Sequence, residues 1–284
     1  MRILIADSGS TKTSWMLVEV NHDVPTVQRA YNTMGLNPLF TKPKQISGTL
    51  TEVLSAFGID TVDALYFYGA GCRDQRCSLV QKSLASVLPS SAVVKVASDI
   101  EGACRAMGDG ICCIMGTGSV AAFFQADTDT LGYCPSLGYI LGDEGSGAYF
   151  GRQVLSDYLK YEMPLKVRKV FEEDFGEISH QEAIAHVYQG QFPNRYLASF
   201  APFIGRHLSL SYCHKVALQG VRAFFKRNVM HLHPKPTDRI SFVGSVAFHL
   251  QDVIREVASC YRLQVGTFLQ NPIDGLVEYH KINH

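Results

Sequence analysis

The sequence predicts a duplicated α/β fold, and two observations carry this prediction. Apolar strands at residues 2–6 and 15–20 flank a turn rich in Gly, Ser and Thr, and apolar strands at 111–115 and 120–124 flank a second turn of the same kind. After each hairpin, strand patterns alternate with helical ones, which is typical of α/β domains. The repetition indicates two related halves, each of which offers one turn to a shared cleft.

The two turns have the chemistry of phosphate-binding loops. The first is Asp7-Ser8-Gly9-Ser10-Thr11 and the second is Gly116-Thr117-Gly118-Ser119. Glycines let the main chain approach a ligand closely, and successive backbone N–H groups form a nest for an anion. Neither turn matches the P-loop or the dinucleotide-binding pattern. Taken alone, either turn is equally compatible with a tight turn that binds nothing.

The composition is that of a globular protein with no formal net charge. Of 284 residues, 46% are hydrophobic and 18% are charged, and 26 basic residues balance 26 acidic ones. A chain of this length can bury the cores of two domains. The charge balance gives no reason to expect nucleic acid or an anionic membrane as a partner. Because a polar turn follows Ala6 and no long apolar run appears later, we expect a cytoplasmic protein.

The eight cysteines form no framework of regular spacings. No Cys-x-x-Cys occurs, and Cys112 and Cys113 adjoin on a strand that should be buried. Reduced, buried thiols are therefore favoured over disulfides or a metal site. The ten histidines are scattered, and we predict no zinc site.

The first half continues with a third strand and then with alternating elements. Strands are predicted at 26–33, 63–68 and 92–97. Apolar residues at helical spacing predict helices at 44–57, 75–88 and 100–107. This order is typical of a sheet that an antiparallel hairpin opens and that then becomes parallel.

The second half repeats this order with a large helical insertion. Its later strands are predicted at 239–243 and 264–269. Helices are predicted at 143–160, 180–188, 196–207, 210–230 and 246–261, with a short one from 273, and the acidic run 172–174 reads as a solvated face. We therefore predict an N-terminal domain of residues 1–108 plus 273–284 and a C-terminal domain of residues 109–272. The helical insertion should occupy about residues 145–235 of the second domain.

Two aspartates have the placement that phosphoryl transfer would require. Asp7 ends the first strand and suits Mg²⁺, which usually keeps several of its waters. Asp99 directly follows the strand at 92–97, so it should point into the cleft as a general base. Its structural alternative is the N-cap of the next helix, with Glu101 in the first turn, and the two roles are compatible.

Hydroxyl groups and two further glycine-rich segments complete the set of candidates. Ser10, Thr11 and Thr13 carry hydroxyls in reach of phosphate oxygens. The segment 142–147, GDEGSG, places two acids among three glycines at a helix start, which favours binding over charge placement at the helix dipole. Gly244-Ser245, at a strand-to-helix turn, could face a nucleotide.

An ordered set of motifs spans nearly the whole chain: DSGSTKTSW, YGAG, ASDIEGA, IMGTGS, LGYILGDEGSGAYFGRQ and FVGSVAF. This set resembles the N-acetylglucosamine kinase / BadF-BadG-BcrA-BcrD ATPase family of the sugar kinase–actin–Hsp70 superfamily. The resemblance implies duplicated actin-like, ribonuclease H-like ATPase domains around a central cleft. It also implies an ATP-dependent carbohydrate kinase that uses Mg²⁺.

The resemblance assigns roles to individual residues. It implies that Asp99 is the catalytic base, that Asp7 holds the metal, and that Gly244-Ser245 borders the adenosine. The first phosphate loop would comprise Asp7, Gly9, Ser10, Thr11, Lys12 and Thr13, and the second Gly116, Thr117, Gly118 and Ser119. The sugar side would comprise Asn37, Gly71, Asp99, Leu137, Gly138, Asp143 and Glu144. Leu137 departs from the family pattern, because the mammalian-like kinases carry Trp there.

Three functions compete on these observations. The first is a kinase of an N-acetylated amino sugar, with N-acetylglucosamine ahead of N-acetylmuramic acid. The second is a BadF/HgdC-type ATPase that activates a dehydratase or reductase by electron transfer, whose relatives hold an iron–sulfur cluster through cysteines after a glycine-rich loop. Here Cys112 and Cys113 precede the loop and Cys134 has no evident mate, which favours the kinase. The third, a nucleotide sensor without turnover, is disfavoured because Asp7 and Asp99 are both present. The oligomeric state stays open, with a homodimer as one option.

Overall fold

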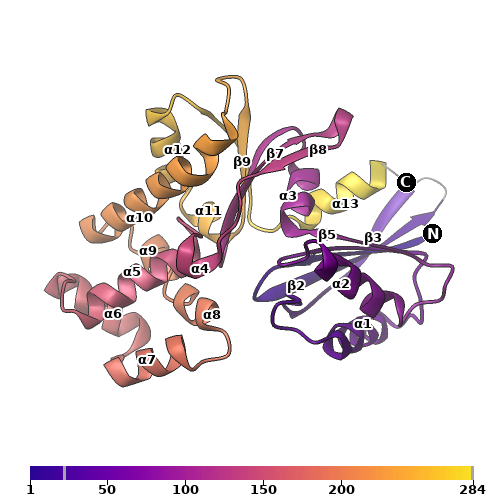
Figure 1. The fold of residues 1–284 in the computed structure, drawn as a ribbon, viewed down its shortest axis with the longest axis horizontal. Helices are drawn as coiled ribbons and strands as arrows, with labels where there is room; N and C mark the ends of the chain where they lie inside the picture. Colours follow the sequence, from indigo (N-terminus) through magenta and orange to yellow (C-terminus); the bar gives the residue numbers. More distant parts are fainter. Residues whose placement is uncertain (22–23, 283–284) are drawn as a thin grey trace. The chain divides into compact units, whose positions relative to one another are not determined.

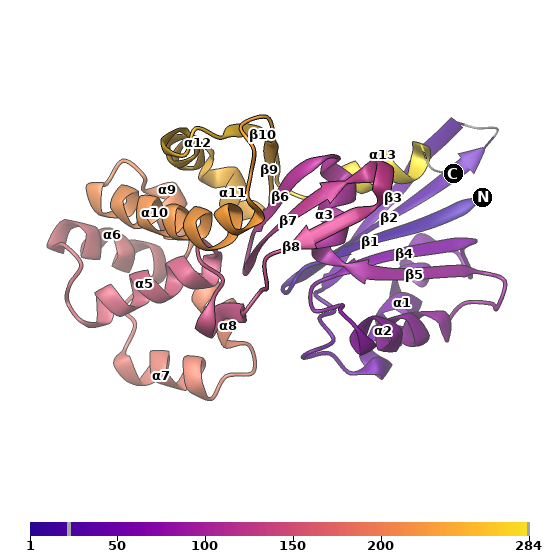
Figure 2. The same cartoon turned by 45° about the horizontal axis from the view of Figure 1, so that its top comes forward.

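A computed structural model describes residues 1–21 and 24–282 and divides the chain into two compact units. Unit 1 comprises Met1–Gly108 with Asn271–His284, and unit 2 comprises Asp109–Gln270. Each unit contains one five-stranded sheet with helices packed on it (Figures 1 and 2). The predicted α/β class with a duplicated actin-like domain is therefore confirmed.

The sheet of unit 1 changes from antiparallel to parallel, as the sequence predicts. Its strands are β1 (Arg2–Ser8), β2 (Lys12–Asn21), β3 (Val24–Met34), β4 (Ala64–Gly69) and β5 (Val93–Ser98). They are arranged in the order β3-β2-β1-β4-β5. β2 pairs antiparallel with β1 and β3, whereas β1, β4 and β5 run parallel. The carboxyl ends of the three parallel strands consequently lie along one edge, where ligands bind in open α/β sheets.

Helices cover both faces of this sheet. One face carries α1 (Pro43–Phe57) and α2 (Gln75–Ala85), and the other carries α3 (Asp99–Met107) and α13 (Ile273–Ile282) (Figure 1). α1 starts at Pro43, turns the side chains of Ile46, Leu50 and Val53 into the core, and ends before Gly58 at φ 64°. A proline at the start and a left-handed glycine after the end are common helix boundaries.

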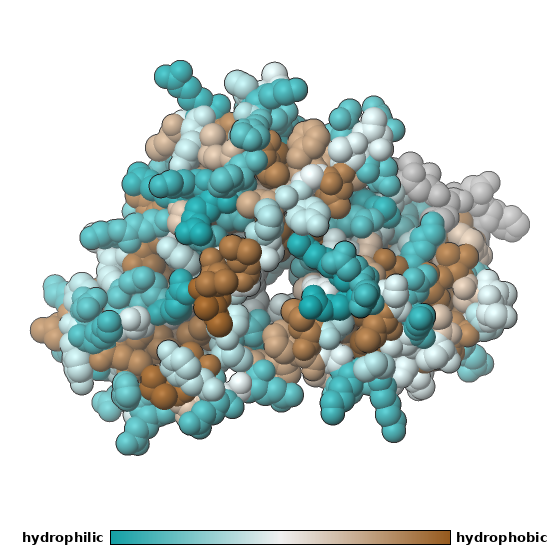
Figure 3. Space-filling model, viewed as in Figure 1, coloured by the Kyte–Doolittle hydropathy of each residue, from teal (hydrophilic) through white to brown (hydrophobic). Residues whose placement is uncertain are grey.

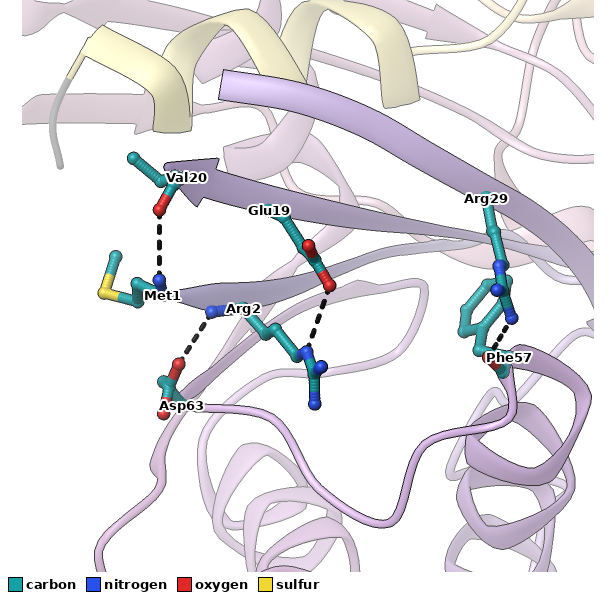
Figure 4. A network of polar contacts seen from close by, with 7 residues as sticks. All are labelled: Met1, Arg2, Glu19, Val20, Arg29, Phe57 and Asp63. Carbon is teal, nitrogen blue, oxygen red and sulfur yellow. Dashed lines mark hydrogen bonds and ion pairs between the residues drawn. The ribbon is translucent and has the colours of Figure 1, made fainter. Parts of the chain in front are cut away.

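A group of polar contacts fixes the opposite, amino-terminal end of β1 (Figure 4). The Arg2 N–H donates to Asp63 Oδ2 at 2.6 Å, and Arg2 Nε lies 3.1 Å from Glu19 Oε1. The N-terminal ammonium donates to the Val20 carbonyl at 3.1 Å. A small hollow at this end is lined by these same charged groups, which neutralise one another. We therefore assign no site to it.

The sheet of unit 2 repeats the connectivity of unit 1. Its strands are β6 (Gly110–Met115), β7 (Ser119–Gln125), β8 (Thr130–Tyr133), β9 (Arg239–Val243) and β10 (Gln264–Leu269). The order β10-β9-β6-β7-β8 places each strand where its counterpart lies in unit 1. β7 pairs antiparallel with β6 and β8, and β6, β9 and β10 run parallel.

The helices of unit 2 enclose one large core. Those between β8 and β9 are α4 (Gly138–Leu141), α5 (Gly147–Leu159), α6 (Leu165–Phe175), α7 (His180–Tyr188), α8 (Pro193–Ala198), α9 (Pro202–Arg206) and α10 (Ser211–Phe224). A π-helical turn, η2 (Phe225–Val229), and a 3₁₀ turn, η3 (Met230–Leu232), extend α10. α11 (Ser245–His249) and α12 (Gln251–Cys260) connect β9 to β10. The core contains several large aromatic side chains among its aliphatic ones, including Phe150, Phe171, Phe203, Phe224 and Phe242.

Several predicted boundaries are wrong. The helix expected at 143–160 begins only at Gly147, because 142–146 form a glycine-rich turn. The helix expected at 196–207 is divided between α8 and α9 at Pro202, whose ring cannot continue the hydrogen-bond ladder. The helix expected at 246–261 is divided at Leu250 into α11 and α12. β8, α4 and α6 were not predicted at all. In the described part of the chain, none of the helices has the length and apolar character needed to cross a bilayer.

Candidate active site

The first turn is held in shape by hydrogen bonds within unit 1. The Gly9 N–H donates to the Lys12 carbonyl at 2.9 Å, and the Gly35 N–H donates to the Thr11 carbonyl at 2.9 Å. A Cβ on Gly35 would clash with the backbone of Gly9 and Ser10, so only glycine fits behind the turn. Thr11 and Lys12 are exposed and Ser10 is half-buried. The turn thus presents ordered polar groups at the carboxyl end of β1.

Thr13 supports this turn from inside. It is fully buried, and its hydroxyl donates to the Met34 carbonyl at 2.9 Å. The buried Ser8 hydroxyl in turn donates to Thr13 Oγ1 at 2.8 Å and accepts the Leu36 N–H at 3.0 Å. The Thr13 hydroxyl is therefore engaged within the hairpin, whereas Ser10 and Thr11 carry their hydroxyls nearer the surface of the turn.

Asp99 is the first residue of α3 and does not cap it. The cap is Ser98, whose Oγ accepts the Glu101 N–H at 3.3 Å. The Asp99 Oδ1 accepts the N–H of Ile100 at 2.9 Å, which fixes the carboxylate beside the helix start. α3 is pressed onto β4 at Gly102, where a Cβ would lie 2.7 Å from Tyr68 Cβ. The expected capping role therefore belongs to Ser98.

Asp7 and Asp99 lie at the carboxyl ends of β1 and β5, and the pKa values of both are raised. Burial, reinforced by the negative charge of Asp99, raises the pKa of Asp7 to about 7, while Lys12 acts against the rise. Burial also raises the pKa of Asp99, and the Ile100 N–H and the Arg73 charge oppose that shift. Burial of two neighbouring carboxylates raises the free energy of their ionised forms, and a bound cation would lower it. Perturbed pairs of this kind cluster at functional sites.

Asn37 and Gly71 lie at the same edge of the sheet. The Asn37 side chain is buried, and its Oδ1 accepts the Leu39 N–H at 2.9 Å. Gly71 follows β4 with φ 78°, and a Cβ there would lie 3.0 Å from Asn37 Cγ. Unit 1 therefore brings together Asn37, Gly71, Asp7 and Asp99 from four separate segments of the chain.

The second turn is fastened to the start of α5 in unit 2. The Gly147 N–H donates to the Gly116 carbonyl at 2.7 Å, and the Ala148 N–H donates to the Thr117 carbonyl at 3.1 Å. Ser119 is buried and donates from its hydroxyl to the Glu144 carbonyl at 2.7 Å. The shape of the turn thus depends on the segment 142–148.

Asp143 and Glu144 reach this turn in different ways. Asp143, at φ 54°, accepts the Ser119 N–H on Oδ1 at 3.4 Å, and a Cβ on Gly118 would lie 3.0 Å from its Oδ2. The Glu144 side chain is instead buried against η2, where Arg227 and Asn228 contact its two carboxylate oxygens. The Asp143 carboxylate therefore borders the turn, whereas that of Glu144 faces the helical insertion.

Gly244-Ser245 forms the predicted strand-to-helix turn and borders a pocket. Gly244 has φ 113°, and a Cβ there would lie 2.9 Å from the Met115 carbonyl carbon, so β9 closely approaches the second turn. Beside it lies a pocket of about 550 Å³. Its lining is mainly small and apolar: Gly116, Thr117, Gly147, Phe150, Ala198, Ala201, Pro202, Gly205, Arg206, Ser245, Val246, His249 and Leu250. Volume and lining suit a nucleobase with its ribose.

Sequence reasoning did not identify most of this pocket. Ala198, Ala201 and Gly205 line it, as does His249, the last residue of α11. The only available signal was their spacing of three and four residues within a predicted helix, which places small side chains on one face. Such a stripe also occurs wherever two helices pack closely, so it did not point to a ligand.

Leu137 and Gly138 lie at an exposed apolar segment. Gly138, at φ 73°, begins the short helix α4, in which Tyr139 packs against the core of unit 2 while Ile140 and Leu141 are exposed. Leu137, Ile140 and Leu141 are 56%, 68% and 69% exposed, and the space-filling view shows a brown patch where α4 lies (Figure 3). Position 137 thus presents an exposed aliphatic side chain and no aromatic ring.

Cys112 and Cys113 are buried on β6, as predicted. Among the described residues, no three His, Cys, Asp or Glu side chains gather in the manner of a protein-only metal cage. A Mg²⁺ ion held by one or two carboxylates, water and a nucleotide needs no such cage. The desolvated carboxylates of Asp7 and Asp99 fit that requirement.

Neither the protein-family models nor the curated proteins give a match to this chain. Among solved structures, the chain is similar to a Porphyromonas gingivalis protein provisionally named N-acetylglucosamine kinase. The two share 38% identity over 99% of each chain, with a TM-score of 0.90. The chain belongs to the N-acetylglucosamine kinase / BadF-BadG-BcrA-BcrD ATPase family.

Two more distant likenesses concern the fold alone. A Chromobacterium violaceum protein, also provisionally named N-acetylglucosamine kinase, is 18% identical over 98% of each chain, with a TM-score of 0.73. Component A of the (R)-2-hydroxyglutaryl-CoA dehydratase of Acidaminococcus fermentans is 13% identical over 100% of each chain, with a TM-score of 0.52. At these identities the match carries no argument for sugar phosphorylation or for electron transfer in this chain.

Proposed function

We propose that this protein is a carbohydrate kinase that transfers the γ-phosphoryl group of ATP to an N-acetylated amino sugar. Family membership supports the kinase class. The observation that carries the proposal is the pair of desolvated carboxylates, Asp7 and Asp99, beside an ordered polar turn. In unit 2 a second such turn borders a pocket suited to a nucleoside. Together these are the parts that phosphoryl transfer requires.

Asp99 is the proposed general base. A sugar hydroxyl would donate its proton to the Asp99 carboxylate as its oxygen bonds to the γ-phosphorus and the bond to the ADP oxygen breaks. Burial raises the pKa of Asp99, which makes the ionised form a better proton acceptor near neutral pH. The Ile100 N–H holds Oδ1 at 2.9 Å and orients the group.

Asp7 is the proposed residue on the metal side. Mg²⁺, when bound with the nucleotide, would neutralise charge on the phosphates and favour the ionised form of Asp7. Ser10 and Thr11, together with the backbone of the first turn, would bind the phosphates. The second turn, Gly116 to Ser119, would do the same in unit 2, with the nucleoside in the adjacent pocket.

The proposed sugar is N-acetylglucosamine, with N-acetylmuramic acid as the competing substrate. Asn37 and Asp143 are the proposed hydrogen-bonding residues, and Gly71 gives access to Asn37 because a larger residue would clash with it. Leu137 and Gly138 belong to the same proposed substrate surface, and Leu137 offers aliphatic contact rather than stacking.

A substrate screen tests this proposal. Purified protein with MgATP is supplied separately with N-acetylglucosamine, N-acetylmuramic acid, glucosamine and glucose, and both ADP and sugar phosphate are measured. We expect ADP and phosphorylated N-acetylglucosamine in equal amounts. ADP release without any sugar phosphate would contradict the proposal. Brown, anaerobically purified protein with stoichiometric iron and sulfide would favour the dehydratase-activating ATPase instead.

A further inference from the structure

Glu144 is a buried acid whose partners come from an unusual helical turn. Its side chain is about a tenth exposed, and its Oε1 lies 2.8 Å from Arg227 Nε. Asn228, itself buried, donates from Nδ2 to the Glu144 Oε2 at 3.3 Å. Both carboxylate oxygens therefore have a donor. A buried carboxylate is tolerated under such pairing, and removing a partner would leave Glu144 uncompensated, whereas the Arg227 side chain is 58% exposed and stays solvated.

The π-helical turn η2 allows two consecutive residues to reach one carboxylate. Neighbouring side chains on a regular α-helix diverge by about 100°. The wider π turn reduces this angle, so Arg227 and Asn228 both contact Glu144. π-Helical turns are rare in proteins, and many of those that occur lie at functional sites. η2 is held by aromatic packing, since Phe225 stacks on Tyr261 at 5.7 Å between ring centroids.

The backbone around Glu144 connects this clamp to the second phosphate turn. The Glu144 carbonyl accepts the Ser119 hydroxyl at 2.7 Å. Gly145, at φ 71°, is so close to α10 that a Cβ would lie 3.0 Å from Phe224 Cβ. Two residues further on, the Gly147 N–H binds the Gly116 carbonyl at 2.7 Å. A shift of Glu144 would therefore move the turn that carries Gly116 and Ser119.

We infer that Glu144 is a positioning residue, which Arg227 and Asn228 clamp so that the second turn keeps the shape needed to bind the nucleotide phosphates. This inference rests on the proposed function and revises one part of it. In this role Glu144 does not touch the sugar, although the family resemblance places it on the sugar side. Arg227 and Asn228 become functional residues although neither belongs to a recognised motif.

Five variants test the clamp, including Arg227→Lys as the conservative replacement. Glu144→Gln removes the charge and keeps the shape, Arg227→Gln removes the cation, and a third variant combines both changes. Arg222→Gln is the matched control, because Arg222 is exposed on α10 and forms no ion pair within the described part of the chain. Dissociation constants for MgATP are measured by calorimetry, and kcat and the two KM values by kinetics. All measurements are made well below the melting temperature of each variant.

A small displacement of a binding group can cost about 100-fold, so we expect each single variant to weaken MgATP binding or kcat/KM for ATP by about 10- to 100-fold. The double variant should be no weaker than the weaker single one, because both changes open the same clamp. Arg227→Lys should recover part of the loss, and Arg222→Gln should match the wild type. The KM for the sugar should change least.

Four outcomes would contradict the clamp, the proposed function or both. If Glu144→Gln raises the sugar KM while Arg227→Gln behaves as the wild type, Glu144 is a sugar ligand and the clamp is wrong. If both single variants lose MgATP affinity equally and only in proportion to a lowered melting temperature, the clamp is also contradicted. A wild type that binds MgATP but phosphorylates no sugar would overturn the proposed function and leave the calorimetric comparison valid. A wild type that binds no MgATP would overturn both.

Discussion

Units 1 and 2 share one sheet topology and differ in what lies at the ends of their strands. In unit 1 the carboxyl ends of β1 and β5 carry the desolvated acids Asp7 and Asp99. In unit 2 the corresponding strands, β6 and β10, end at Met115 and Leu269, which cannot ionise. The pair of aspartates with raised pKa values at the strand ends therefore belongs to unit 1.

The connection between the third and fourth strands of each sheet differs even more. In unit 1 it contains the single helix α1, whereas in unit 2 it contains every element from α4 to η3. This insertion supplies Ala198, Ala201 and Gly205 to the pocket and Arg227 to the clamp. On the same frame of strands, unit 1 thus carries the two aspartates with raised pKa values and unit 2 carries the pocket.

The largest expected effect comes from removing the acid of unit 1. Asp99→Asn keeps the shape but cannot accept a proton, so kcat should fall by about 10²- to 10⁴-fold. The melting temperature should stay near that of the wild type, because Ser98 rather than Asp99 caps α3. Steady-state kinetics and thermal unfolding check this. Near-full kcat in the variant would mean that the base lies elsewhere, with Asp143 as the next candidate.

A smaller effect should follow from filling the pocket of unit 2. Val246 is half-buried on α11 and lines the pocket, so Val246→Phe should raise the KM for ATP by about tenfold, as steric changes in apolar pockets do. The sugar KM should stay unchanged. Phe248→Ala, on the same helix but outside the pocket lining, is the control. A variant with normal ATP affinity would show that the nucleoside binds elsewhere.

Asp7 should also make the stability of the nucleotide-free protein depend on pH. Its pKa is raised from 3.8 to about 7, so the folded protein binds this proton more tightly than the unfolded chain does. The stabilisation of the folded protein by this proton is complete below the ordinary pKa of 3.8 and is lost as pH rises through about 7. Between pH 5.5 and 8 the melting temperature of the wild type should therefore fall more than that of Asp7→Asn. Equal slopes in the two proteins would contradict the raised pKa.

The smallest effect on catalysis is expected from removing Ser98, the N-cap of α3. Ser98→Ala removes the acceptor of the Glu101 N–H and should lower the free energy of unfolding by about 1 kcal/mol. At temperatures where the variant is fully folded, kcat should change far less than in Asp99→Asn. Chemical denaturation and kinetics measure the two quantities. A kcat loss as large as that of Asp99→Asn would show that cap and base cannot be separated.

The elements with strong local signals could be predicted from the sequence. β9 and β10 are compact runs with β-branched or aromatic residues, and the structure has them at the predicted bounds. The two hairpins were recognised because glycine and hydroxyl residues interrupt apolar strands. The buried thiols of Cys112 and Cys113 followed from the same apolar run.

The features that were missed have weak or ambiguous local signals. β8 has four residues, one of them Gly132, and exists because its backbone pairs with β7. α6 was overlooked because the acidic run 172–174 concealed the apolar residues Val167 and Phe171. Ser98 and Asp99 are both good capping residues, and only the backbone geometry distinguishes them. The predicted roles in catalysis and binding stay predictions until the variants are measured.

The division of roles between the two units is tested most directly by titrating a non-hydrolysable MgATP analogue into Asp99→Asn and Val246→Phe side by side. We predict that Asp99→Asn binds the analogue with the affinity of the wild type although it turns over little sugar. Val246→Phe should bind it about tenfold more weakly and, at saturating ATP, keep most of the wild-type kcat. If Asp99→Asn loses affinity as far as Val246→Phe does, the acid of unit 1 is not a separate catalytic group and the central claim is wrong.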